Sequence, residues 1–138
     1  MGIRVKVEIR VGEETVTTAA LLNSGYEAEE PEIHIPPSLA SRLGLRAGAS
    51  EEYATVGTRV EARILGYVQV RVVAADRSSA WVRAKAVSVE GEDEVLLSDK
   101  LIDALGIEPV KPGRGLWRFS GEEGLRTSVE PQLWPGGA

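Results

Sequence analysis

Cysteine is absent from this sequence of 138 residues, and histidine and asparagine occur once each, at His34 and Asn23. Without cysteine the chain can form no disulfide, no zinc–thiolate site and no thiol nucleophile. A single histidine without a recognisable local signature gives no support to a Ser–His–acid hydrolase. These absences remove several common kinds of catalytic site.

Long apolar runs are also lacking, and none approaches the length that would span a bilayer. Residues 1–6 alternate charged and β-branched side chains and lack the apolar centre of a signal peptide. We therefore expect a cytoplasmic protein with no membrane partner.

Positive charge is not in excess, because 16 Lys and Arg stand against 21 Asp and Glu, a net charge of −5. A nucleic-acid binder needs a basic face to meet phosphates, so we expect no nucleic-acid partner. No glycine-rich loop carries the Lys-Ser/Thr pair of a nucleotide site, and we expect no cofactor. Side-chain amides are few, occurring only at Asn23, Gln69 and Gln132, and many residues are ionic. This composition is typical of a thermophile.

The N-terminal segment predicts a β-hairpin. Residues 3–11 alternate apolar and charged side chains, residues 12–14 supply a turn, and residues 15–22 form a second strand of β-branched and small residues. The alternation is lost over residues 19–22, as in a strand buried on both faces. We expect this strand to deliver Asn23 into the interior.

The rest of the chain reads as more short strands and two short helices. Proline at 36 and 37 starts a helix over residues 39–43, and Ser98 or Asp99 caps a second one that Gly106 ends. We predict an all-β closed barrel with one or two short helices, in a domain of residues 1–119. Residues 120–138 are predicted to be a C-terminal arm or tail, either loose or in contact with a dimer partner. The other expected strands lie at 33–35, within 51–75 around a turn at 56–58, and at 80–90, 94–97 and 115–119.

The chain contains a short internal repeat. The segment from Leu39 to Leu45 reads LASRLGL, and the segment from Leu101 to Ile107 reads LIDALGI. Each follows an apolar strand and a polar turn, so the two halves repeat one pattern of strand, turn and helix.

At these residues the sequence resembles the retropepsin-like aspartic proteases, the single-lobe homodimeric relatives of pepsin. In that family an apolar strand enters Asp-Thr/Ser-Gly, a glycine-tipped flap follows, and a second apolar strand leads into Gly-Arg-Asp/Asn and a short helix. The matching segments here are Leu21–Gly25 for the first signature, Tyr53–Ile64 for the flap, Leu96–Ile102 for the second signature, and Gly115–Phe119 for the closing strand.

The resemblance implies a homodimer that holds an extended polypeptide or peptide in a shared cleft. It places Asn23 at the position of the catalytic Asp, followed by Ser24 and Gly25, which hold the catalytic group in place. It also places Val56, Gly57 and Thr58 at the substrate-binding tip of the flap. No metal is implied.

The chain departs from the family pattern at four positions. Asn23 replaces the catalytic acid, Ser98 stands where Gly is usual, Asp99 where Arg is usual, and Lys100 where an acid or amide is usual. An amide cannot act as a general base at ordinary pH, so we predict that the protein as written does not hydrolyse peptides. The internal Arg–carboxylate bond of the family is not expected here.

Three origins of Asn23 stay open at this point: a deliberate inactivating replacement, a native residue, and a site that deamidates to Asp because Gly25 leaves the backbone mobile. An ordinary turn, with Asn23 bonding its own backbone, is the plainer reading of the motif. The alternative function is a non-enzymatic peptide-binding or assembly module on the same fold.

Two further features predict surface roles. Glu27, Glu29, Glu30 and Glu32 precede His34, and we interpret them as a solvated acidic loop with an exposed histidine, not a metal site. Trp81 and Trp117 are expected in the core, whereas Trp134 between two prolines is expected to contact a partner.

Overall fold

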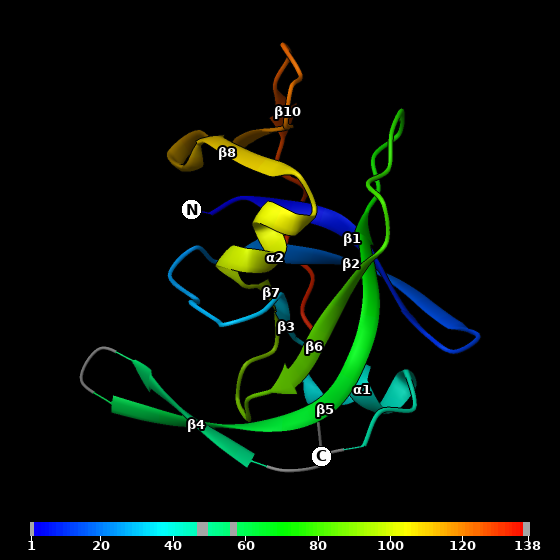
Figure 1. The fold of residues 1–138 in the computed structure, drawn as a ribbon, viewed down its shortest axis with the longest axis vertical. Helices are drawn as coiled ribbons and strands as arrows, with labels where there is room; N and C mark the ends of the chain where they lie inside the picture. The colour runs from blue at the N-terminus through cyan, green and yellow to red at the C-terminus, as the bar shows by residue number, and fades with distance from the viewer. Residues whose placement is uncertain (1, 47–49, 56–57, 137–138) are drawn as a thin grey trace.

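The computed structural model describes residues 2–46, 50–55 and 58–136 (Figure 1). Its main feature is a closed six-stranded barrel in the order β1-β2-β7-β3-β6-β5, with β5 pairing back onto β1. The fold class predicted from the sequence is confirmed. The strands are β1 (Arg4–Val11), β2 (Glu14–Leu22), β3 (Glu32–His34), β4 (Ser50–Thr55), β5 (Thr58–Val72), β6 (Val82–Ser88), β7 (Val95–Leu97), β8 (Ile107–Lys111), β9 (Leu116–Phe119) and β10 (Arg126–Thr127).

The hairpin of β1 and β2 follows the predicted alternation. In β1 the residues Val5, Val7 and Ile9 are fully buried, whereas the charged residues between them point outward. β1 pairs antiparallel with β2 along its whole length and with β5 over residues 7–10. Both edges of β1 are therefore occupied within the chain.

One long strand serves both the barrel and an outlying hairpin. β5 pairs with β4 over its first part and with β6 over its second, and the register shifts between Ile64 and Gly66. Gly66 has a φ of 107°, a value that L side chains rarely adopt. The bulge at this glycine lets the strand bend from the hairpin into the barrel wall.

The internal repeat corresponds to two short helices, α1 (Pro37–Arg42) and α2 (Asp99–Ala104). Each ends two residues before a glycine in the left-handed region, at Gly44 (φ 75°) and Gly106 (φ 73°). The predicted cap at Ser98 is present, because the Ser98 hydroxyl accepts a hydrogen bond from the backbone N–H of Leu101.

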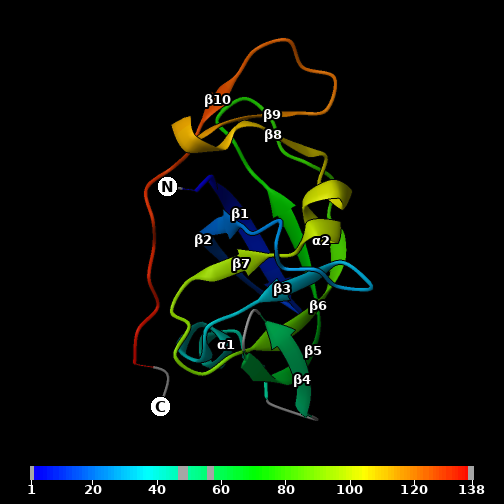
Figure 2. The ribbon, with the colours of Figure 1, turned by 90° about the vertical axis from the view of Figure 1, so that its left-hand side faces the viewer.

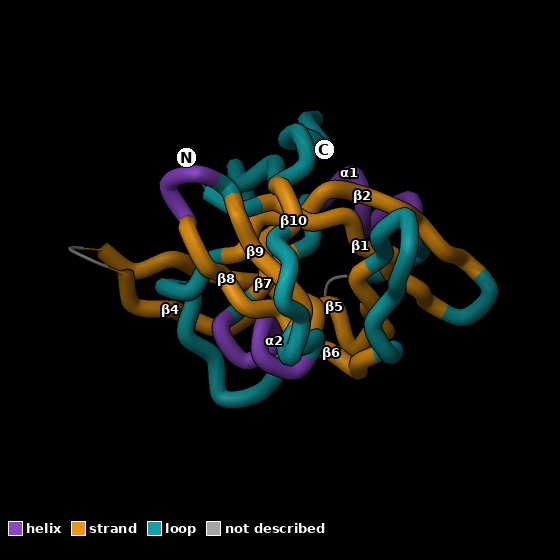
Figure 3. Tube along the Cα trace, turned by 90° about the horizontal axis from the view of Figure 1, so that it is seen from above, coloured by secondary structure: helices purple, strands orange, loops and turns teal. Residues whose placement is uncertain are grey.

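A small second sheet of β10, β9 and β8 covers one end of the barrel (Figures 2 and 3). Trp117 and Phe119 of β9 are buried, with ring centroids 5.1 Å apart in an edge-to-face arrangement. The sequence analysis did not anticipate β8, because Pro109 interrupts its pattern and removes a ladder donor.

Residues after β10 lie against the barrel of their own chain. The backbone N–H of Val129 donates to the Arg4 carbonyl, and the N–H of Arg4 donates to the Ser128 hydroxyl. The Trp134 indole donates to Thr18, and the Trp134 carbonyl accepts from Ser38. Trp134 therefore bonds to the barrel of its own chain, and its expected contact with a partner stays a prediction.

None of the helices in the described ranges has the length and hydropathy that a bilayer crossing requires.

His34 is buried, with 2% of its surface exposed, and the expectation of an exposed histidine is wrong. Residues 33–35 all face protein, because β3 lies between β6 and β7 inside the barrel wall. The His34 Nδ1 lies 2.9 Å from the Glu94 carbonyl oxygen, and Nε2 lies 3.4 Å from that of Val89. Burial lowers the pKa of His34 below its usual value, because its effect is larger than that of the two carbonyl contacts, which raise the pKa.

The lowered pKa of His34 predicts a loss of stability in mild acid. Below a pH of about 6.5 the unfolded chain binds a proton at His34 more readily than the folded chain. The free energy of unfolding should therefore fall between pH 7 and 5, by about 1.4 kcal/mol per unit of pKa difference. Urea unfolding at both pH values should show a larger fall for the wild type than for His34→Gln, which does not titrate. Equal falls in both proteins would contradict this account.

Candidate functional site

The candidate site lies where β2 and β7 end side by side. The two strands are parallel over Ala20–Leu22 and Val95–Leu97, so their carboxyl ends meet at one edge. The backbone N–H of Asn23 donates to the Leu97 carbonyl at 3.1 Å. The two signature segments, far apart in sequence, are therefore joined at residue 23.

Asn23 opens a β-turn that projects from this edge. The backbone N–H of Tyr26 donates to the Asn23 carbonyl at 2.9 Å, which closes the turn. Asn23 is half-buried, and Ser24 and Gly25 are exposed. The strand thus delivers Asn23 to a partly open surface, not to the interior as expected.

The Asn23 side chain makes no hydrogen bond to the residues that the structure describes. Its Oδ1 lies beside Gly25, at 3.5 Å from where a Cβ would stand on that residue. In an ordinary Asx-turn this oxygen would accept a nearby backbone N–H. Here the turn is closed by the backbone alone, which leaves the carboxamide available for contacts outside the chain.

Ser98, which caps α2, and Asp99, its first residue, hold in place the loop that follows the residue-23 turn. The backbone N–H of Asp99 donates to the Tyr26 carbonyl at 2.9 Å, and Asp99 Oδ1 accepts the N–H of Ala28 at 3.2 Å. Ser98 and Glu32 exchange bonds: the Glu32 N–H donates to the Ser98 hydroxyl at 3.0 Å, and the Ser98 N–H donates to the Glu32 carbonyl at 3.1 Å. We call these contacts the Ser98–Asp99 brace.

The brace gives Ser98 and Asp99 a structural role in this chain. A hydroxyl and a carboxylate at these positions accept the backbone N–H groups of Glu32 and Ala28. The sequence analysis identified Ser98 as a helix cap but not its second role, because Glu32 is 66 residues away in the chain.

A buried carboxylate lies behind the turn. Glu32 has 2% of its surface exposed, its carboxylate accepts a hydrogen bond from the Tyr26 hydroxyl, and the Lys85 Nζ lies 3.9 Å away. Burying a carboxylate is costly unless such partners satisfy it. The interpretation of an acidic loop in solvent is wrong for Glu32 and correct for the exposed Glu27 and Glu29.

The described residues hold no group of three or more His, Asp or Glu side chains suited to a metal ion. The expected flap corresponds to the hairpin of β4 and β5, in which Thr55 pairs with Thr58 through the backbone. Val56 and Gly57 lie outside the described residues. In Figure 2 the loop after β2 faces the viewer, with the small sheet above it and this hairpin below.

Comparison with known proteins bears on the fold. No known family matches the sequence, and no curated protein does either. Among solved structures, the crystal structure of the retroviral protease-like domain of Ddi1 from Leishmania major is similar, with a TM-score of 0.51 and 11% sequence identity. The match covers 98% of this chain and 97% of that one.

The chain has a retropepsin-like fold. At 11% identity the likeness concerns the path of the backbone and not the chemistry of the site. The barrel, the hairpin in the flap position and the paired ends of β2 and β7 are features of that fold in this chain.

Replacing Ser98 tests the brace. Ser98→Ala removes the cap of α2 and leaves the buried N–H of Glu32 without an acceptor, which should lower the free energy of unfolding by about 2 kcal/mol. Ser41→Ala, at an exposed position of α1, should change it by less than about 0.5 kcal/mol. Urea denaturation measures both. Similar small effects in the two variants would show that the Ser98 hydroxyl does not support the loop.

Proposed function

We propose that this protein is a retropepsin-like aspartic endopeptidase homologue that binds extended peptides as a homodimer and is inactive because residue 23 is an amide. The observation that carries the proposal is the position of Asn23. Its turn stands at the joined ends of β2 and β7, the brace holds the following loop, and its side chain has no partner in the described chain.

The chemistry needs a carboxyl group at this turn in each of two copies. Two carboxyls held close together share one proton, since both cannot ionise. The ionised one takes a proton from water, and the protonated one hydrogen-bonds the carbonyl of the peptide. Two carboxamides have the size for this arrangement but cannot accept the proton.

The proposal is supported by the fact that the turn at residue 23 is held without any hydrogen bond from the Asn23 side chain. Backbone bonds from Tyr26 and Leu97 set the position of residue 23, so a carboxylate can replace the amide without altering the turn. The exposed Gly25 leaves room beside Oδ1 for a second group to approach.

Restoring the acid tests the catalytic proposal. Asn23→Asp should hydrolyse an unfolded polypeptide at roughly pH 4 to 6, at least about 100-fold faster than the wild type, since it regains a general base. The control Asn23→Ala should stay inactive, and intact-mass measurements should exclude deamidation of the wild type. A folded, dimeric Asn23→Asp protein without activity would rule out the catalytic proposal.

A second function, peptide binding without cleavage, is supported by the same free carboxamide, which can both donate and accept hydrogen bonds. In that case the dimeric Asn23→Asp protein does not hydrolyse polypeptides, although the wild type binds extended peptides.

The proposed dimer would bring the two residue-23 turns together at a two-fold axis. The start of β1 and the C-terminal arm bond to each other within one chain through Arg4, Ser128 and Val129. The outer edge of β8 is bonded to no described strand. We propose that the turn and this edge meet the partner.

A charge at the axis should separate the subunits. Light scattering should give twice the 14.8 kDa chain mass for the wild type. Ser24→Arg should shift the protein to the monomer, because it places two like charges side by side at the axis. Ser41→Arg, on the exposed side of α1, should leave the dimer intact. A monomeric wild type at high concentration would contradict the proposed assembly.

A further inference from the structure

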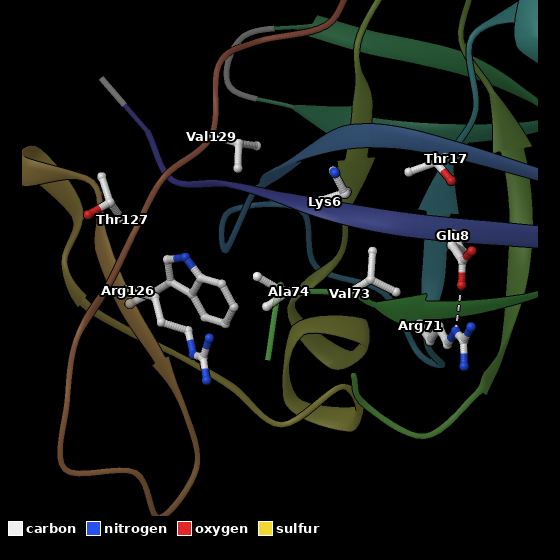
Figure 4. A pocket seen from close by; sticks show the side chains of 11 residues that line it. Lys6, Glu8, Thr17, Arg71, Val73, Ala74, Arg126, Thr127 and Val129 are labelled. Carbon is white, nitrogen blue, oxygen red and sulfur yellow. Dashed lines mark hydrogen bonds and ion pairs between the residues drawn. The ribbon is translucent and has the colours of Figure 1, made fainter. Parts of the chain in front are cut away.

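A cavity separate from the candidate site lies where the small sheet meets the barrel (Figure 4). Its volume is about 560 Å³, within the range of small-molecule sites. Neither the residue-23 turn nor the brace contributes to its lining. Its lining includes Lys6 and Glu8 from β1, Arg71 from β5, Trp117 from β9 and Arg126 from β10, with several aliphatic residues around them.

Two arginines form rigid parts of the wall. Arg71 donates to Glu8 at 2.6 Å and lies 4.6 Å from the centre of the Trp81 ring. Arg126 donates to both oxygens of Asp76, at 2.7 and 3.1 Å, and to both oxygens of Glu122. These bonds hold the pKa of the Glu122 carboxyl at about 2. Both guanidinium groups are therefore neutralised and fixed in place.

Lys6 differs from the two arginines. Among the described residues, no carboxylate lies within ion-pair distance of its ammonium group, and it is exposed on β1. Its positive charge is therefore the one in the lining that no described carboxylate balances. A rigid wall with one unbalanced cation is suited to an anion.

The remaining lining consists of aliphatic side chains, two threonines and Trp117, which carries one unsatisfied donor. Val73, Ala74 and Val129 offer aliphatic surface, and Figure 4 shows them close to the β1 side chains. Trp117 is 4% exposed, and its indole N–H has no hydrogen-bond partner among the described residues. A buried N–H without an acceptor costs about 1–3 kcal/mol.

We propose that this cavity binds a small organic anion, with its carboxylate or phosphate on Lys6 and its apolar part against Val73, Ala74 and Val129. The arrangement follows the usual division of a ligand site into an apolar lining and a few placed polar groups. Neither the catalytic nor the binding role of residue 23 enters this inference.

Phenylacetate tests the proposal, with neutral phenylacetamide as its matched control and phenyl phosphate as a second anion. In nitrogen–proton correlation spectra the three tryptophans supply three indole signals, and Trp117→Phe assigns the one from the cavity. Phenylacetate should shift this signal and the backbone amides of Lys6 and Thr127. Stronger shifts with phenyl phosphate would identify phosphate as the preferred group, and stronger shifts with phenylacetate would identify carboxylate.

Removing the charge provides the decisive comparison. Lys6→Gln should weaken binding of the anions roughly tenfold, as expected for a charge-assisted hydrogen bond, and should not affect phenylacetamide. Lys100→Gln, at an exposed lysine of α2 outside the cavity, should bind like the wild type. Equal binding of the anion and the amide, or no shift with either anion at millimolar concentration, would overturn the proposal.

Discussion

The parallel pairing of β2 with β7 is the constraint on which this structure depends. Parallel neighbours cannot be joined by a tight turn, so the chain between them must travel through β3, α1, the β4–β5 hairpin and β6 before it returns. That excursion builds β3, β5 and β6 of the barrel. It also brings the ends of β2 and β7 to one edge, where the Asn23 N–H meets the Leu97 carbonyl.

The hydrogen bonds that hold the loop at this edge do not involve the side chain of residue 23. Buried polar groups must be paired, and here the Asp99 and Ser98 side chains accept the backbone N–H groups of Ala28 and Glu32. The Tyr26 hydroxyl donates to the Glu32 carboxylate. None of these bonds uses the side chain of Asn23. The backbone of the turn is therefore held without help from the residue-23 side chain.

The C-terminal arm determines which surfaces remain open. It bonds to Arg4 at the start of β1 and to Thr18 and Ser38 farther along the barrel. This contact occupies backbone groups that would otherwise be free to pair with another chain. It also sets β9 and β10 across the outer face of β1, and the cavity beside Lys6 follows from that crossing.

Local pattern was enough to predict much of the fold. Strict alternation in residues 3–11 identified β1, the proline pair at 36 and 37 identified the start of α1, and Ser98 identified the cap of α2. Each of these signals depends on neighbours within a few residues. β8 was missed for the same reason, because Pro109 breaks a local pattern that tertiary pairing with β9 overrides.

The sequence by itself determined the N-terminal hairpin, the two short helices, the absence of thiol chemistry and the presence of an amide after the second strand. Only the tertiary structure decided that His34 and Glu32 are buried, that Ser98 and Asp99 support the turn, and that the arm folds onto its own barrel. The physical reason is distance along the chain. Burial and hydrogen bonding between residues separated by tens of positions depend on how the barrel closes, and no local pattern encodes that closure.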